Sequence, residues 1–276
     1  SRAIAGDQYF PGSVFKVLMT AAALESGDYT AESEFLNPAE LPLPLSTKSV
    51  KNSGGRLCGG EETTTLEEAF RLSCNIPYAE LGLELGETAI GSMADDFGFG
   101  ATLEIPLQVT PSNFPRGLDD AQLMLSSFGQ FDVRVTPLQV AMLSAGVANG
   151  GVLMKPNLVD QVIAPNLRVL QSYEPTIYSR PLSPPVAQEM TRMMVNNVSQ
   201  GVASAARIPG ISVAGKTGTA ETGIGDGRSF WFTGFAPAEN PELVIAVVIE
   251  GSSTEGTANS VASPVAKTIM EAVISR

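Results

Sequence analysis

The sequence predicts an α+β fold in which a small antiparallel sheet packs against helices. Apolar residues recur at helical spacing over much of the chain, three β-rich runs follow between 211 and 251, and a helical pattern over 263–275 closes the sequence. Helices followed by consecutive strands and a terminal helix are typical of an α+β layer. We therefore expect the sheet to be formed by the C-terminal part of the chain.

Each predicted helix has a recognisable start or end. The first stops at Gly27, the residue type that often follows a helix end. Thr64 and Glu67 have the spacing of a capping box, and Thr136 precedes Pro137 as N-cap and first helical residue. These patterns predict helices over 13–26, 64–70, 136–149, 183–200 and 263–275.

The strands are predicted from "ISVAGKTGTAET", "SFWFTGFAP" and "ELVIAVVIEG". The turn compositions "GIGDG", residues 223–227, and "PAENP" separate them and favour an antiparallel meander. Two stretches rich in Pro, Gly or Ser, 27–62 and 101–117, are predicted to be ordered surface loops.

Composition excludes several kinds of chemistry. The 276 residues contain no histidine, so a Ser-His-Asp or Cys-His arrangement is impossible within this chain. With only two cysteines as well, a zinc site is nearly excluded, and a proton shuttle must be lysine, a carboxylate, tyrosine or water. The net charge of −12 without a basic stripe argues against nucleic acid as a partner.

The stretch "YFPGSVFKVL" places Ser13 and Lys16 one helical turn apart at a predicted helix start. Average residue usage gives about one such Ser-x-x-Lys match by chance in a chain of this length, so the motif alone is weak. Residues at i and i+3 share a helix face, however, and a neutral lysine there can take the proton of the serine hydroxyl. With histidine absent, this pair is a candidate nucleophile and base.

Two further motifs follow. "KTGT", Lys216–Thr219, lies in a predicted strand and is expected by chance less than about once in a hundred such chains. Its Lys216 can point toward a site, and we expect Gly215 and Gly218 to let a peptide-like ligand approach the backbone.

The other motif is "SCN", Ser73–Asn75, which follows the helix predicted over 64–70. Taken alone, it is typical of a turn. The order and structural context of the three motifs carry more weight than any one.

Together these motifs resemble the penicillin-binding proteins and serine β-lactamases, and most of all the transpeptidase domain of class B penicillin-binding proteins. The resemblance extends to "SRAIAGDQYFPGSVFKV", "SSFGQFDVRVTPLQVAMLSAGVANGGVLMKP" and "VAGKTGTAE". The stretches "GGRLCGG" and "SCN" are more similar to the actinobacterial penicillin-binding protein A type.

The resemblance implies a role for each matching residue. Ser13 would be acylated by a D-Ala-D-Ala stem peptide or a β-lactam, with Lys16 as its general base. Ser73 would relay protons between the two lysines, and Asn75 would fix Lys16 and hydrogen-bond the substrate amide. The substrate-binding strand would comprise Lys216, which adds positive potential, Thr217 and Thr219, which bind the substrate carboxylate, and Gly218. The backbone N–H groups of Ser13 and Thr219 would form the oxyanion hole.

The resemblance also implies the setting of the reaction. No cofactor is required, and the partners would be peptidoglycan stem peptides, β-lactam antibiotics and the cell-wall synthesis machinery. In this family the antiparallel sheet is packed between an all-helical subdomain and terminal helices. It has five strands, two of which precede the nucleophile helix and would be absent from this chain. We therefore expect residues 1–276 to be the C-terminal portion of a transpeptidase domain. The missing strands, any pedestal domain and a membrane anchor would precede it and hold it at the extracytoplasmic face of the cell membrane.

In the extracytoplasmic space that the resemblance implies, Cys58 and Cys74 could form a disulfide, with two buried free thiols as the alternative. A bond closing a loop of that size would stabilise the fold by about 3 kcal/mol and tether one wall of the site.

The leading hypothesis is a D,D-transpeptidase. The first alternative is a hydrolase, either a D,D-carboxypeptidase or a β-lactamase, in which water accepts the acyl group. A class A lactamase is disfavoured because no E-x-x-L-N segment lies between residues 76 and 215. The second alternative is a sensor module that is acylated without turnover.

Overall fold

The computed structural model describes residues 2–103, 105–107, 109–221, 227–251 and 256–274. Its central sheet is an antiparallel meander with the strand order β11-β10-β9. The strands are β9 (Ala214–Glu221), β10 (Arg228–Ala236) and β11 (Leu243–Gly251). The three predicted strands are thus confirmed, while most of the turn predicted at 223–227 lies outside the described residues.

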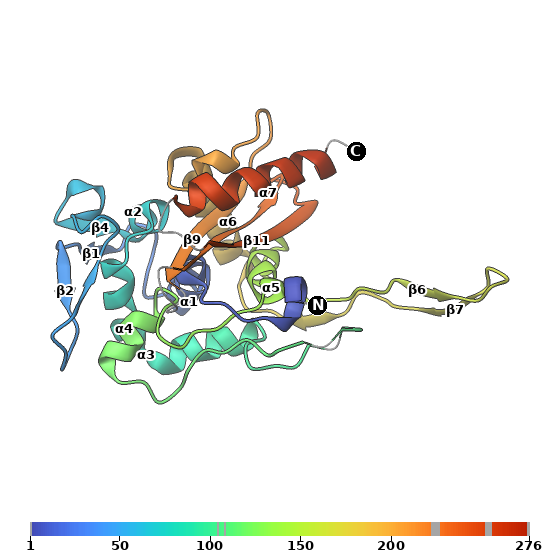
Figure 1. Cartoon of the computed structure of the whole chain (residues 1–276), viewed down its shortest axis with the longest axis horizontal. Coiled ribbons are helices and arrows are strands. Elements are labelled where there is room, and N and C mark those ends of the chain that lie inside the picture. The colour runs from blue at the N-terminus through green and yellow to red at the C-terminus, as the bar shows by residue number, and fades with distance from the viewer. Residues whose placement is uncertain (1, 104, 108, 222–226, 252–255, 275–276) are drawn as a thin grey trace.

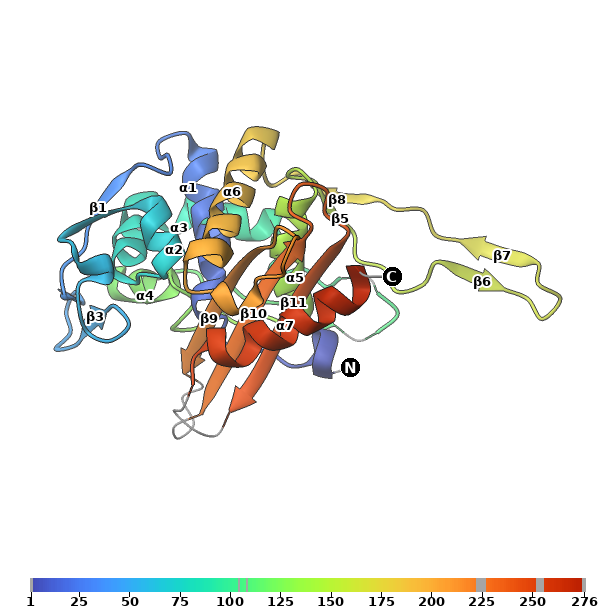
Figure 2. The same ribbon diagram turned by 90° about the horizontal axis from the view of Figure 1, so that it is seen from above.

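The central strand β10 faces two cores, because successive side chains of a strand point to opposite faces. Trp231 packs into the larger core, whereas Phe230 and Phe232 pack into the smaller one. Helix α7 (Ala258–Ile274) covers the face of the smaller core. Helices α1 (Lys16–Ser26) and α5 (Pro137–Ala148) lie across the opposite face (Figure 2). The sheet is therefore sandwiched between helices, as predicted.

All the helices before β9 belong to a mostly helical region on the side of the sheet opposite α7 or beside it (Figure 1). They are α1 (Lys16–Ser26), α2 (Leu66–Leu72), α3 (Ile76–Asp96), α4 (Asp120–Ser126), α5 (Pro137–Ala148) and α6 (Pro184–Gln200). The short helices are η1 (Arg2–Gly6), η2 (Gly12–Phe15), η3 (Cys58–Gly60) and η4 (Ser204–Ala206).

Some predicted helix boundaries are wrong. The cap of α2 is Thr65, whose hydroxyl accepts from the Glu68 N–H, and not Thr64. Thr64 instead lies inside the strand β4 (Thr63–Thr65). Helix α7 begins at Ala258, before the predicted start at 263, and helices α3 and α4 were not predicted. Local caps therefore locate a helix but leave its ends uncertain by a few residues.

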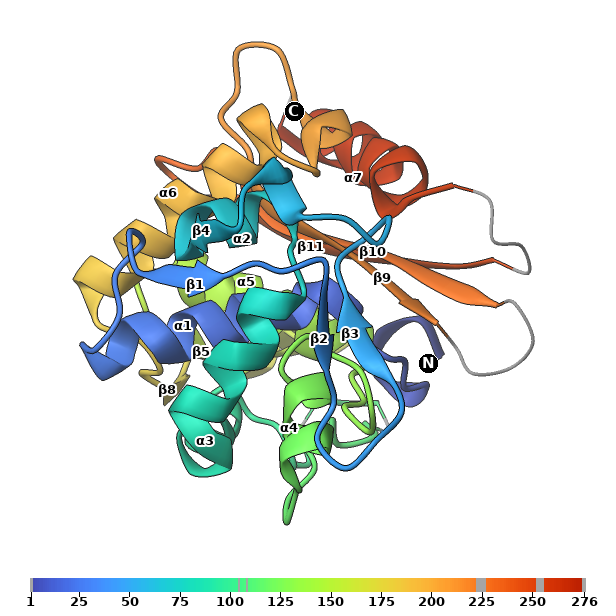
Figure 3. The ribbon, with the colours of Figure 1, turned by 90° about the vertical axis from the view of Figure 1, so that its left-hand side faces the viewer.

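The segment 27–62, predicted to be a loop, contains short strands. Strand β1 (Glu34–Leu36) pairs with β4, and β2 (Glu40–Pro42) pairs with β3 (Ser49–Lys51). In Figure 3 the β2–β3 hairpin lies in front of the helical region, beside α4. Strands of three residues leave almost no alternation in the sequence, which explains why they were missed.

A long hairpin projects from the body of the protein (Figures 1 and 2). At its root β5 (Leu153–Met154) pairs with β8 (Ile177–Ser179), and further out β6 (Gln161–Ile163) pairs with β7 (Val169–Ser172). Every residue of β6 and β7 is exposed. We call residues 155–176 the arm.

None of the described helices combines the length and the hydropathy that a membrane crossing requires.

Candidate active site

Ser13 lies in the 3₁₀ turn η2, which continues directly into α1 at Lys16. Side chains three residues apart eclipse one another in a 3₁₀ helix, so this turn places Ser13 and Lys16 on one face. Ser13 is half-buried, whereas Lys16 is fully buried. In the described part of the chain no hydrogen bond joins the Ser13 hydroxyl to the Lys16 ammonium. Such contacts often tighten only with substrate.

The Ser-x-Asn motif follows α2. Ser73 has a left-handed backbone conformation with φ 63° and ends that helix. This sharp turn directs both the carbonyl and the hydroxyl of Ser73 toward the site. Lys16 Nζ donates to Ser73 O at 2.8 Å and to Asn75 Oδ1 at 2.9 Å. The base candidate is therefore held by the Ser-x-Asn motif.

Lys216 approaches the same serine from β9. Its Nζ donates to Ser73 Oγ at 2.8 Å and to the Thr217 carbonyl at 3.1 Å. Ser73 thus bridges the two lysines, with its hydroxyl on Lys216 and its carbonyl on Lys16. The structure therefore brings Lys16, Ser73, Asn75 and Lys216 together, and the catalytic roles that the resemblance implies for them stay predictions.

Both lysines are buried, and within the described ranges neither has a carboxylate partner. Burial and the neighbouring Lys216 ammonium hold the pKa of Lys16 well below its ordinary value of 10.5. Burial lowers the pKa of Lys216 to about 7. A buried ammonium without a counterion is costly, so the pair favours a state with a neutral amine, which is a base.

Each lysine lies beside an aromatic ring that the sequence analysis did not single out. Lys16 Nζ is 5.2 Å from the centre of the Tyr78 ring, and Lys216 Nζ is 5.5 Å from the centre of the Phe70 ring. The rings exclude water while their faces offer weak stabilisation of a cation. No local signal marked them, because an aromatic residue on a helix usually indicates core packing.

Strand β9 packs directly onto the nucleophile turn. A methyl group on Gly218 would lie 2.8 Å from Pro11 O and 2.8 Å from Val14 N. Gly12 has a φ of +52°, and a methyl group on it would lie 2.5 Å from Thr219 O. The peptide of Thr219 therefore lies against the turn that carries Ser13.

Protein atoms lie close to both glycines of the strand. Gly218 admits the backbone around η2, and a methyl group on Gly215 would lie 2.5 Å from the Phe232 ring. The close approach of a peptide-like ligand to these two residues stays a prediction.

The two threonines of the strand differ in exposure. Thr217 is buried, and its hydroxyl lies 3.5 Å from the Val202 carbonyl, whereas the Thr219 side chain is exposed. Residues two apart share a strand face, so both threonines lie on the face opposite Lys216. Among the described residues, no hydrogen bond links either threonine hydroxyl to the group formed by the lysines and Ser73.

The segment before Ser13 is fixed to the centre of the sheet. Trp231 is fully buried, and its Nε1 donates to Phe10 O at 3.0 Å. The Tyr9 ring meets the Trp231 ring edge-on with centres 5.8 Å apart. These contacts hold the entry to η2 against the sheet.

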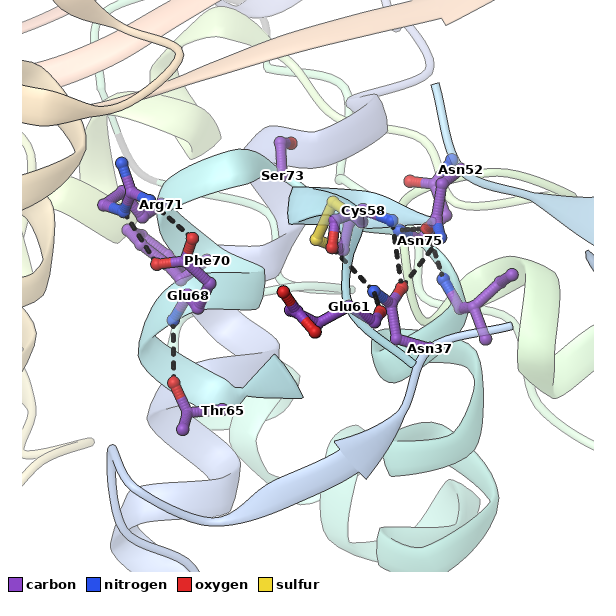
Figure 4. The surroundings of a disulfide bond; sticks show 12 residues. Asn37, Asn52, Cys58, Glu61, Thr65, Glu68, Phe70, Arg71, Ser73 and Asn75 are labelled. Carbon is purple, nitrogen blue, oxygen red and sulfur yellow. Dashed lines mark hydrogen bonds and ion pairs between the residues drawn. A yellow bond between two sulfur atoms is a disulfide. The ribbon is translucent and has the colours of Figure 1, made fainter. Parts of the chain in front are cut away.

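Cys58 and Cys74 form a disulfide with their Cα atoms 5.7 Å apart. Of the two alternatives left open by the sequence, the structure therefore contains the bonded one. Cys74 is the middle residue of Ser-x-Asn, so the bond ties this motif to η3 (Figure 4). One wall of the site is covalently tethered.

Comparisons with known proteins agree with this geometry. The family model described as the penicillin-binding protein transpeptidase domain matches residues 2–271. The chain belongs to this family. Among similar proteins, peptidoglycan D,D-transpeptidase PbpA of Mycolicibacterium smegmatis is 39% identical over 99% of this chain and 56% of its own length. This chain thus spans little more than half of that relative.

Solved structures give the same result. Penicillin-binding protein A from M. tuberculosis, solved as a penicillin G acyl-enzyme complex, has a TM-score of 0.92 and 38% identity, covering 99% of this chain and 62% of that one. The D,D-transpeptidase domain of a peptidoglycan glycosyltransferase from Eggerthella lenta has a TM-score of 0.90 and 30% identity, covering 99% and 67%. The predicted fold class and the predicted family are confirmed.

Proposed function

We propose that this chain carries the active site of a peptidoglycan D,D-transpeptidase and that Ser13 forms the acyl-enzyme. The observation that carries the proposal is the pair of buried lysines around Ser73, one of them a single turn from Ser13. Two buried amines without a described carboxylate partner favour a neutral lysine, and a neutral lysine activates a serine hydroxyl.

In the proposed reaction Ser13 Oγ attacks the carbonyl carbon of the penultimate D-Ala, and Lys16 Nζ takes the hydroxyl proton. The tetrahedral intermediate collapses, the C–N bond breaks and the terminal D-Ala leaves with a proton. An amino group of a neighbouring stem peptide then attacks the ester and releases Ser13. A β-lactam would follow the first half of this sequence, its ring opening as the C–N bond breaks.

The other residues hold the substrate. Thr219 lies against the Ser13 turn, which supports an oxyanion hole formed by their two backbone N–H groups. Thr217 and Thr219 share a face on which a carboxylate can bind, with Gly218 between them, and Lys216 adds positive potential. The second N–H of the Asn75 amide is available for a substrate carbonyl, because Nδ2 donates to Lys51 O through the first.

Ser73 would complete the proton path. Its hydroxyl contacts Lys216 in the structure, while its carbonyl contacts Lys16. A relay between the lysines therefore needs the hydroxyl to turn toward Lys16 by rotation about the Cα–Cβ bond. This motion is small and leaves the backbone contact with Lys16 intact.

The relatives support the substrate class. A similar protein is named a peptidoglycan D,D-transpeptidase, and a similar structure contains an acyl-enzyme formed with penicillin G. By analogy we propose stem peptides ending in D-Ala-D-Ala as substrates and β-lactams as inhibitors. An extracytoplasmic location beside the cell-wall synthesis machinery follows from that substrate.

The proposal is tested by incubating the protein with a fluorescent penicillin and measuring intact masses over hours. We expect one adduct on the wild type that persists for hours and none on Ser13→Ala. Rapid return to the unmodified mass would favour a hydrolase instead. A persistent adduct without turnover of a thioester substrate would favour a sensor. An adduct that survives in Ser13→Ala would exclude the assigned nucleophile.

A further inference from the structure

Asn75 is the N-cap residue of α3, but its side chain does not cap that helix. An asparagine at this position normally accepts a hydrogen bond from one of the first backbone N–H groups of its own helix. Here Asn75 Oδ1 accepts from Lys16 at 2.9 Å, and Nδ2 donates to Lys51 O at 3.0 Å. The start of α3 therefore needs an acceptor from elsewhere.

Asn52 supplies that acceptor from the end of the β2–β3 hairpin. Its Oδ1 accepts from the backbone N–H of Asn75 at 2.8 Å and from that of Ile76 at 3.1 Å. Asn52 is 3% exposed, so water does not compete for these contacts. Figure 4 shows Asn52 beside Asn75. Since the carbonyl of the preceding residue, Lys51, accepts from the Asn75 side chain, two successive residues hold both the backbone and the amide of Asn75.

Asn37 fixes which way the Asn52 amide faces. Asn52 Nδ2 donates to Asn37 Oδ1 at 3.0 Å. Asn37 Nδ2 in turn donates to the carbonyls of Cys58 and Glu61 at 2.6 and 2.8 Å. Two carbonyl acceptors require the NH₂ group on that side, so Asn37 must present its oxygen to Asn52. The Asn52 oxygen is thereby directed at the start of α3.

We propose that Asn52 is a positioning residue for the acylation reaction, acting through Asn75 on Lys16, and that Asn37 orients it. The inference rests on the proposed function, because positioning has meaning only if Lys16 activates Ser13. Asn52 holds the backbone N–H groups of Asn75 and Ile76, and so fixes the turn from which the Asn75 amide reaches Lys16. Without Asn52 these two N–H groups lose their acceptor, the start of α3 shifts, and Asn75 Oδ1 no longer holds Lys16 in place.

The test compares Asn52→Ala with Asn52→Asp and with a matched control. The aspartate keeps an acceptor for the two N–H groups and suits the positive end of a helix. Asn259→Ala is the control, because the Asn259 Oδ1 also accepts a backbone N–H from another segment, that of Ala205, on the far side of the sheet. The measured quantities are the second-order rate constant of acylation by a fluorescent penicillin and the melting temperature.

We expect acylation by Asn52→Ala to be at least about 10-fold slower, since small displacements of reacting groups are costly. Asn52→Asp should recover most of the rate even if its melting temperature stays low. Asn259→Ala should acylate at the wild-type rate despite a lower melting temperature. An Asn52→Ala variant that is destabilised but acylates normally would show that Asn52 is only a structural cap.

A double-mutant cycle with Asn75→Ala separates positioning from general damage. If Asn52 acts through Asn75, Asn52→Ala has little further effect in the Asn75→Ala background, whereas independent effects would overturn the proposal. If Asn52→Ala does not fold, Asn37→Ala replaces it, with an expected loss of about 3-fold. A wild-type rate in that folded variant would also overturn it. Failure of the wild type to form any Ser13 adduct would instead reject the proposed function, and the positioning role with it.

Discussion

Backbone atoms hold the functional groups in place on one side of the candidate site, and side chains do so on the other. The strand wall is β9, which is fixed by its ladder with β10 and by glycines that let it lie against η2. The helical wall consists of η2, α1 and residues 73–75, which are fixed by a disulfide and by asparagine contacts.

This difference has a consequence for chemistry. Backbone hydrogen bonds hold a strand in place whatever its side chains are, so the side chains of the strand wall can be chosen for substrate binding along the strand edge. Side-chain hydrogen bonds require particular residues, but they can keep an amine buried and oriented. The helical wall therefore suits the base. Lys216 belongs to the strand wall yet contacts Ser73 of the helical wall, and it joins the two.

The largest expected effect comes from Lys216→Met. The pKa of Lys216 is about 7 in the folded protein against an ordinary value of 10.5, so between these values the unfolded chain binds a proton that the folded protein lacks. Stability from this group thus rises with pH across that window. From pH 7 to 10 the unfolding free energy of the wild type should rise, relative to the variant, by on the order of 3 to 4 kcal/mol. Denaturant unfolding at several pH values measures this.

The same variant also reports on Lys16. The Lys216 ammonium lowers the pKa of Lys16, so removing it should raise that pKa. The acidic limb of the acylation rate against pH should then move to higher pH. A limb that stays in place or moves down would contradict the assignment of Lys16 as the base coupled to Lys216.

The next largest effect is expected from removing the disulfide that tethers the helical wall. Replacing both cysteines, Cys58→Ala with Cys74→Ala, should lower the unfolding free energy by about 3 kcal/mol, because the unfolded chain gains freedom. Acylation should fall far less, since the Asn52 contacts with Asn75 remain. The reduced wild type is the matched control, and an acylation loss as large as that of Asn52→Ala would assign the positioning to the disulfide instead.

The smallest of the three effects is expected from a substitution that disrupts the packing of the strand wall against η2. In Gly218→Ala the added methyl group meets backbone atoms of η2 that cannot move independently, so β9 and the Ser13 turn must separate. We expect acylation to be about 100-fold slower, equivalent to about 2.7 kcal/mol. Gly251→Ala is the control, because among the described residues the tightest contact of its methyl group would be with the Phe230 ring at 3.1 Å, and the backbone oxygen of Arg228 would lie at an ordinary 3.9 Å. Equal rates in the two variants would show that the close packing does not matter.

The strand wall was largely predictable from the sequence. Local sequence patterns predicted its strands, and the structure contains them. These patterns are the β-rich runs, the "KTGT" motif and the position of Lys216 within it. The helix around Ser13 and Lys16 was also predicted, but its first turn is the 3₁₀ turn η2, and α1 begins at Lys16 and not at the predicted residue 13. The atoms that the two glycines contact could not be predicted, because these neighbours lie far away in the sequence and no local pattern indicates them.

The supports of the helical wall could not be predicted. Asn52 is 23 residues from Asn75, and Asn37 lies a further 15 residues back, in a segment whose Pro, Gly and Ser content indicates a loop. An asparagine in such a segment ordinarily indicates a turn. Only the fold brings these three amides together, and pairing between distant segments has no periodic signature.

The arm has a practical consequence for protein engineering. Residues 155–176 leave and re-enter the body where β5 and β8 already pair, so the root would remain a hairpin if the arm were shortened. Lengthening it is also inexpensive, since each doubling of a flexible loop costs only about 0.6 kcal/mol. Its tip lies far from α1 and β9 along the long axis of the molecule, which makes it a suitable attachment point for a fluorophore or a fused domain (Figure 1).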